Sequence, residues 1–329
     1  MSSLKMSDTW QIDFWDVGQG DGSVILLPTG EYILIDTGPA TFANPLSSWF
    51  LQPRYHDAKA RIKAVVVTHN DQDHIGGLLK LLNDSRQQID AVYLVVDKTA
   101  AQLPKDMKAT WDALYKRKLA GKTQTLLLNT QSPTLHKDAS FCLTVRHPEP
   151  LDAFGSRPNN SVSGILVLER VSDGMAFVIW CGDALLASVA KNCTTTFPAV
   201  MVGPHHGAPQ DKGKHAFREG LNAIHPNCLF ISHGNQHKHP DFDYIYAAAH
   251  LPATVCCSEI ASSCPAATLT TEQHLFPGSA RLNLPVPLNA RQCRGTMRIF
   301  INVNGVCYDN PNHEEFLNRI KQRSTFFCR

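Results

Sequence analysis

The sequence predicts an α/β protein in which two β-sheets are packed between layers of helices. First, the 329 residues are 43% apolar and 18% charged, which allows a full hydrophobic core and excludes a disordered chain. Second, apolar runs of strand length recur, with helical patterns among them, in the order β-rich, β–α, β-rich, β–α. Third, His and Asp residues stand where several of these strands end, and sites gather at strand ends in layered folds.

The first half of the chain begins with a predicted β-meander. Residues 12–17 and 23–27 are short alternating runs on either side of a glycine-rich turn, and residues 32–35 follow a second turn. A β-branched run at 62–68 predicts a buried strand, which leads into a helix start at 76–82. Further predicted elements are a strand at 91–96 and a helix within 98–122.

The second half is predicted to be rich in strands and then to add helices. Strands are expected at 141–145, 164–169, 176–181, 199–202 and 228–232, and helices at 185–192, 215–221 and 244–250. From residue 253 the composition shifts towards Cys, Ser, Thr and Pro. We therefore predict one domain, residues 1–252, and a cysteine-containing C-terminal extension, residues 253–329, packed on it. The extension is expected to end in strands at 296–303 and 305–308 and a helix at 313–321.

Charge and hydropathy restrict the class of protein. With 31 basic and 29 acidic side chains the net charge is only +2, so no global basic field indicates nucleic-acid binding. The pI of about 8.0 disfavours a long duplex-DNA groove. No signal-peptide pattern opens the chain, and no apolar run reaches the roughly 18 residues of a membrane span. We expect a cytoplasmic protein without a membrane partner, whose ten cysteines are reduced thiols or metal ligands.

A dense group of metal-capable side chains follows the strand at 62–68. His69, Asp71, Asp73 and His74 lie within six consecutive positions, and their nitrogen and oxygen atoms suit Zn²⁺ or Mn²⁺. Because the backbone turns from strand to helix here, His69 and Asp71 can face one ion while Asp73 and His74 face another. A polar loop with Asp73 as a helix cap is the alternative, but two His and two Asp at this density rarely serve capping alone.

Three later strand ends carry the same residue types. Asp183 follows the strand at 176–181, where a carboxylate is placed to bridge two cations. His205 and His206 follow the strand at 199–202. Only one of them is expected to face the ions, because consecutive strand residues point to opposite sides, and we favour His205. The last strand end supplies His233, His237, Lys238 and His239.

In this order the motifs resemble the metallo-β-lactamase superfamily, in its competence-nuclease (ComEC-like) branch and in a soluble, stand-alone form. The resemblance extends over about residues 11–250. It is carried by FWDVGQGDGS at 14–23, ILIDTG at 33–38, THNDQDHIGG at 68–77, Gly182-Asp183, PHHG at 204–207 and His239-Pro240. The first motif is specific to the branch, and the His-Asp-Asp-His run is specific to the superfamily.

The resemblance implies an αββα four-layer sandwich with two divalent metal ions, Zn²⁺ or Mn²⁺, at one edge of the sheets. The implied metal ligands are His69 and Asp71 for one ion, Asp73, His74 and one of His205 and His206 for the other, and Asp183 between both. Asp36 is implied to lie behind residues 69–74, which we call the metal loop, where it would hold a ligand in place.

One ligand of the superfamily has no clear counterpart in this sequence. His147 is one candidate for this middle position, and the loop with Asn159 and Asn160 is the other. We favour the asparagine loop, because the competence branch carries asparagine-rich loops there. This choice leaves one ion with fewer nitrogen ligands and makes Mn²⁺ plausible.

Two neighbouring cations suit hydrolysis, because they lower the pKa of a bridging water and stabilise a developing oxyanion. The resemblance favours a phosphodiesterase or nuclease acting on nucleic acid or a nucleotide, with Asp73, Asp183 and His239 as catalytic residues. His233, His237 and Lys238 are candidates for contacting the substrate. The alternatives are an acyl hydrolase (lactamase, lactonase or thioesterase) at the same dinuclear site and a non-catalytic effector or binding subunit.

A third, structural zinc is predicted in the C-terminal extension. This region has few large apolar residues, and a short region that buries little area often needs a metal or a disulfide to hold it. The candidate ligands are Cys257, Cys264, His274 and Cys293. The alternative is that these cysteines are ordinary buried thiols, because free cysteine is among the most buried residue types.

Overall fold

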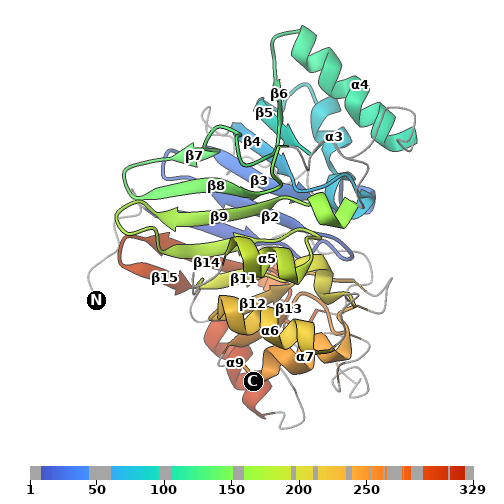
Figure 1. Cartoon of the computed structure of the whole chain (residues 1–329). Coiled ribbons are helices and arrows are strands. Elements are labelled where there is room, and N and C mark those ends of the chain that lie inside the picture. Colours follow the sequence, from blue (N-terminus) through green and yellow to red (C-terminus); the bar gives the residue numbers. More distant parts are fainter. Residues whose placement is uncertain are drawn as a thin grey trace.

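Two β-sheets lie face to face between helices in the computed structural model (Figure 1). The structure describes residues 9–43, 61–95, 105–150, 159–193, 198–209, 214–234, 239–251, 253–261, 264, 276, 278–282, 292–309 and 312–322. The αββα sandwich expected from the sequence is confirmed. No helix in these described residues is long and apolar enough to span a membrane.

The first sheet has the strand order β15-β14-β1-β2-β3-β4-β5-β6. Its meander, β1 to β3, is antiparallel as predicted, whereas β3 to β6 run parallel. The strands are β1 Trp10–Phe14, β2 Gly22–Leu26, β3 Tyr32–Thr37, β4 Ile62–Val67, β5 Ile89–Leu94, β6 Gln124–Leu127, β14 Met297–Asn302 and β15 Gly305–Tyr308. The parallel arrangement brings the ends of β3 and β4, with Asp36 and the metal loop, to the same sheet edge.

The second sheet has the order β13-β12-β11-β10-β9-β8-β7. Strands β10 to β13 are parallel, so the segments that follow them gather at one edge. The strands are β7 His136–Lys137, β8 Phe141–His147, β9 Ile165–Arg170, β10 Ala176–Trp180, β11 Val200–Val202, β12 Cys228–Ile231 and β13 Thr254–Cys257. Asp183 follows β10 and the two adjacent histidines follow β11.

Helices cover the outer face of each sheet. The first sheet carries α3 and α4, whose apolar side chains pack on residues such as Val65 and Val92. The second sheet carries α5, α6 and α7, which lie side by side in Figure 1. The helices are α2 Gln72–Ile75, α3 Leu78–Asn83, α4 Lys105–Leu119, α5 Leu186–Asn192, α6 Lys214–Ile224, α7 Phe242–Ala249, α8 Gly278–Arg281 and α9 Asn312–Gln322.

The main core lies between the two sheets and fixes their relative position. Phe14 of β1 reaches across to Trp180 and Phe230, with ring centroids 6.2 and 5.5 Å apart. All three side chains are almost completely buried. Burial of an aromatic ring of this size stabilises the fold by roughly 1.5–3 kcal/mol. The strand ends that carry His and Asp are therefore held on a rigid support.

The predicted C-terminal extension contributes strands to both sheets. Strand β13 extends the second sheet beside β12, and β14 pairs with β1 in the first. Arg298 of β14 donates two hydrogen bonds of 2.6 and 2.7 Å to the carboxylate of Asp13, which is buried. The pairs at 297–302 and 305–308 and the C-terminal helix match the predicted elements. The domain boundary at residue 252 remains a prediction.

Candidate metal centre

The metal loop begins where β4 ends, and the carboxylate of Asp36 fixes this point by hydrogen bonds to Thr68. Asp36 accepts hydrogen bonds from the backbone N–H of Thr68 at 2.8 Å and from its hydroxyl at 2.7 Å. The glycine-rich turn before β2 lies against the same loop, because the N–H of Asp21 donates to the carbonyl of Asp73 at 3.2 Å. Only glycine fits at Gly20, where φ is +130° and a Cβ would lie 2.0 Å from that carbonyl oxygen.

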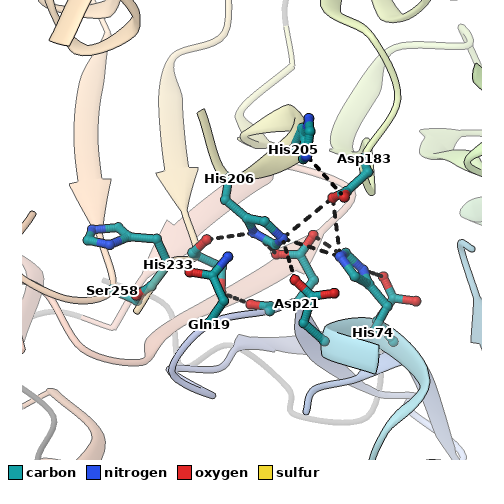
Figure 2. A network of polar contacts seen from close by, with 12 residues as sticks. Gln19, Asp21, His74, Asp183, His205, His206, His233 and Ser258 are labelled. Atoms are coloured by element: carbon teal, nitrogen blue, oxygen red, sulfur yellow. Dashed lines mark hydrogen bonds and ion pairs between the residues drawn. The ribbon is translucent and has the colours of Figure 1, made fainter. Parts of the chain in front are cut away.

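The carboxylate of Asp183 lies at the centre of four histidines, of which Figure 2 labels His74, His205 and His206. Its Oδ2 lies 3.3 Å from Nε2 of His69 and 3.5 Å from Nε2 of His205. Its Oδ1 lies 3.2 Å from Nε2 of His74 and 3.4 Å from Nε2 of His206. The two oxygens of one carboxylate thus each face a separate pair of imidazole nitrogens.

The other distances between candidate ligand atoms lie between 3.3 and 3.8 Å. Nε2 of His206 lies 3.3 Å from Nε2 of His74 and 3.4 Å from Oδ2 of Asp73. Nε2 of His69 lies 3.8 Å from Oδ2 of Asp71. Ligand atoms around a tetrahedral ion with bonds of about 2.1 Å are about 3.4 Å apart.

The donor set therefore fits two divalent cations. His69 with His74 and Asp183, and Asp73 with His74 and His206, form groups whose ligand atoms lie within 4.8 Å of one another. Nε2 of His69 and Oδ1 of Asp183 are buried yet make no hydrogen bond among the described residues. Buried polar atoms normally have partners, and a cation would supply one here.

Groups behind the histidines orient their rings. Nδ1 of His74 donates to Asp36 at 2.9 Å, and Nδ1 of His206 donates to the carbonyl of Ser232 at 2.8 Å. Nδ1 of His69 lies 3.3 Å from the hydroxyl oxygen of Thr68. A proton held on Nδ1 leaves the lone pair of Nε2 for a metal, which is the usual arrangement of metal-binding histidines.

The electrostatic field of the centre favours positive charge. Burial alone would raise the pKa of Asp183, but the surrounding histidines hold it well below its usual range. Burial would also raise the pKa of Asp73, yet His206 and His74 lower it. Burial would lower the pKa of His206, but Asp21 and Asp183 raise it to about 9. The carboxylates thus stabilise cationic partners, as a divalent metal ion requires.

Asp21 is a site residue that the sequence reasoning missed. Its Oδ1 lies 3.6 Å from Nδ1 of His206, and its Oδ2 lies 4.0 Å from Nδ1 of His74. Burial raises the pKa of its carboxyl to about 6. Asp21 lies in the FWDVGQGDGS motif on which the resemblance rests, but nothing in that motif indicates that its carboxylate faces His74 and His206.

The preference for His205 over His206 rested on a premise that the structure does not support. The two residues are not in an extended strand: both have left-handed backbone conformations, with φ of 50° and 51°. Their side chains therefore do not point to opposite sides. His206 is the one that lies with Asp73 and His74, and its side chain is buried.

The two candidates for the middle position are placed differently. Nε2 of His147 lies 2.9 Å from the carbonyl oxygen of Ser161, so this nitrogen supports the turn Asn159–Val162, and a metal-binding role of His147 stays a prediction. The side chain of Asn160 lies 3.3 Å from Nδ1 of His205, at the edge of the centre. The side chain of Asn159 lies outside the part that the structure describes.

The predicted substrate residues after β12 separate from one another. The ring of His239 lies 5.9 Å from that of His205, at the border of the centre. His233 is not brought there: its side chain is completely buried, and Figure 2 shows the ring on the far side from Asp183. Its backbone N–H donates to the hydroxyl of Ser258. His237 and Lys238 lie outside the described residues.

The proposed structural zinc finds no assembled site in the part of the chain that the structure describes. Cys257 and Cys293 are buried in the main core, and Cys264 packs against it. None of them belongs to a group of three or more metal-capable side chains among the described residues. His274 lies outside those residues, so the zinc stays a prediction.

Comparisons with known proteins bear on the fold and the relatives. Residues 31–192 match the model of the β-lactamase superfamily domain. ComE operon protein 3 of Bacillus subtilis is 27% identical over 260 residues, covering 71% of this chain and 30% of that protein. Recombination protein 2 of Haemophilus influenzae is 32% identical over 74 residues, covering 22% of this chain and 9% of that protein.

The chain spans less than a third of the length of these two curated relatives, at 30% and 9%. Among solved structures, the metallo-β-lactamase fold protein YhfI from Bacillus subtilis is 13% identical with a TM-score of 0.48, covering 76% of this chain and 96% of that one. The domain match and the two-sheet topology agree with the fold expected from the sequence.

Proposed function

Because the chain has the metallo-β-lactamase fold of metal-dependent hydrolases, we propose that it is a phosphodiesterase or nuclease with a dinuclear metal centre. One observation carries the proposal: each oxygen of the Asp183 carboxylate faces its own pair of histidine nitrogens, at 3.2–3.5 Å. This spacing supports a carboxylate shared by two cations. The sequence similarity to a protein named Recombination protein 2 supports a nucleic-acid substrate.

The residues of the chain divide the work of the reaction. When bound, two cations would lower the pKa of a bridging water and neutralise charge on the phosphate oxygens. Asp183 would hold both ions at a fixed spacing, and Asp36 would keep the His74 lone pair directed at the centre. His239 borders the centre, from where it could donate a proton to the leaving oxygen.

A substrate panel with matched variants tests this proposal. The purified protein would be loaded with Zn²⁺ or Mn²⁺ and assayed on bis(p-nitrophenyl) phosphate, single-stranded oligonucleotides, nitrocefin, a lactone and a thioester. We expect phosphodiester cleavage that Asp183→Ala abolishes together with most of the bound metal. Asp173→Asn, which alters an exposed ion pair with Arg170, is the control and should retain both.

The other outcomes would overturn the proposal in separate ways. Turnover of nitrocefin, the lactone or the thioester without phosphodiester cleavage would assign an acyl hydrolase. Metal binding without turnover of any substrate would favour a binding or effector subunit. Normal rate and metal content in Asp183→Ala would exclude the shared-carboxylate centre itself.

A further inference from the structure

The adjacent histidines that follow β11 have an unusual backbone. His205 has φ 50° and ψ 42°, and His206 has φ 51° and ψ 21°. Left-handed conformations cost a residue with a Cβ about 1–2 kcal/mol each. The backbone is held there by hydrogen bonds from the N–H of His205 to the carbonyl of Gly182 and from the N–H of Ala208 to the carbonyl of His205, at 2.9 and 2.7 Å. Such strain persists where the surroundings impose it, and it clusters at functional sites.

This backbone lets both rings approach the same carboxylate. In an extended strand one of two consecutive side chains would point away from Asp183. Here the ring centroids are 6.4 Å apart, and Nε2 of His205 faces Oδ2 whereas Nε2 of His206 faces Oδ1. The pair is therefore divided between the two sides of the shared carboxylate.

On the Oδ2 side of Asp183, His205 is joined by one other histidine. Besides Asp183, the residues at this side are His69 and Asp71. His147 is engaged with the carbonyl of Ser161. Nε2 of His205 lies 3.5 Å from Oδ2, close to the spacing of about 3.4 Å between ligands of a tetrahedral ion. His205 is in none of the groups whose ligand atoms all lie within 4.8 Å of one another, so binding one ion would draw the rings of His205 and His69 closer together.

We propose that His205 is the second nitrogen ligand of the ion held by His69, Asp71 and Asp183, so that each of the adjacent histidines binds a different ion. Asn160 lies against the His205 ring, 3.3 Å from Nδ1 and 3.4 Å from Nε2, and positions it. The proposal rests on the dinuclear centre of the proposed function, but not on the phosphodiester chemistry. In this ligand set, the adjacent residues His205 and His206 supply one nitrogen to each ion, so both nitrogens come from the end of the same strand.

Metal affinity, measured without any substrate, tests the assignment. Zn²⁺ and Mn²⁺ would be titrated against a chromophoric chelator, and bound metal would be counted after equilibrium dialysis. We expect the wild-type chain to bind two equivalents. His205→Ala should still bind one ion normally, whereas its affinity for the other should fall at least about 100-fold. Loss of a group that only orients a ligand already lowers metal affinity about 10–100-fold.

Companion variants keep the result interpretable. His205→Gly adopts the left-handed backbone and offers no side-chain ligand, so its fold should be preserved while its metal loss matches that of His205→Ala. Asn160→Ala should weaken the same ion by a smaller factor. His250→Ala, at an exposed histidine whose ring packs on Tyr246, is the matched control.

Three results would overturn the inference. They are two equivalents of unchanged affinity in a folded His205→Gly, loss of both ions together in that variant, and a wild-type chain that binds fewer than two. If the wild type binds two ions, loses one in His205→Gly and cleaves no phosphodiester, the proposed function fails while the ligand assignment stands.

Discussion

Replacing Asp36 by Asn would test how the groups behind the ligands support the centre. Asp36 is almost completely buried and has φ 56°, a conformation that Asn also tolerates. Its Oδ1 accepts from the Thr68 N–H at 2.8 Å. Its Oδ2 accepts from the Thr68 hydroxyl at 2.7 Å and from His74 Nδ1 at 2.9 Å. Every group that contacts this carboxylate here is a donor.

An amide cannot satisfy all of these donors. If its oxygen remains near the Thr68 N–H, its NH₂ group faces Nδ1 of His74, and the imidazole must move its proton to Nε2, which removes the lone pair that a metal needs. If the amide is reversed, NH₂ opposes the Thr68 N–H instead. Losing such an orienting partner typically costs about 10–100-fold in metal affinity. That factor corresponds to about 1.4–2.7 kcal/mol.

The assay is competition for Zn²⁺ or Mn²⁺ with a chromophoric chelator, accompanied by urea unfolding of the metal-free protein. We expect weaker metal binding together with a loss of about 1–3 kcal/mol in the free energy of unfolding, from the buried donors left unsatisfied. Asp173→Asn is the control, because its exposed pair with Arg170 contributes little. Metal affinity within threefold of wild type in Asp36→Asn would refute the reasoning.

Three other expectations concern stability. Gly20→Ala should weaken metal binding and lower the free energy of unfolding, because its Cβ would meet the Asp73 carbonyl at 2.0 Å; Gly30→Ala, with no atom within 4 Å, is the comparison, and similar losses in both would argue against the contact. Burial lowers the pKa of His233 to about 4, so the folded protein favours the neutral ring. The stability that the neutral ring provides is present above pH 6.5 and is lost as pH falls towards 4. From pH 7 to pH 5 the free energy of unfolding, measured with urea, should fall by about 2 kcal/mol, and His233→Leu should remove this pH dependence. The same pH dependence in wild type and variant would contradict the prediction. Arg298→Leu leaves the Asp13 carboxylate buried and unpaired and should cost about 3–5 kcal/mol, whereas Asp13→Leu with Arg298→Leu should recover part of it; equal losses would speak against the pair.

The parts of the site that depend on local pattern could be predicted from the sequence. The segment from His69 to His74 contains several candidate ligands close together, and the β-branched residues before it indicate a strand. Hydrophobic periodicity likewise located Asp183 after a strand, because a buried strand must end in a turn at the surface of the sheet. These features involve residues close together in the chain.

Features that depend on backbone conformation or distant pairing could not be predicted in this way. The approach of both His205 and His206 to Asp183 follows from their two positive φ values, which the residue types at these positions do not indicate. The role of Asp21 requires that the turn before β2 lie against the metal loop at Asp73, which is far away in sequence. The place of β13 in the second sheet depends on its pairing with β12, because its short run resembles many others.

The pairing of β1 with β14 has a consequence for how the chain folds. Asp13 and Arg298, which face each other across these strands, are 285 residues apart in sequence. At a synthesis rate of about 5–20 residues per second, roughly 15–60 s pass between the appearance of the two strands on the ribosome. During that interval one edge of β1, with its apolar side chains, has no neighbour to complete the sheet. Folding of this sheet is therefore expected to be slow and late, and the edge of β1 is the segment most in need of a chaperone while the chain is still being made.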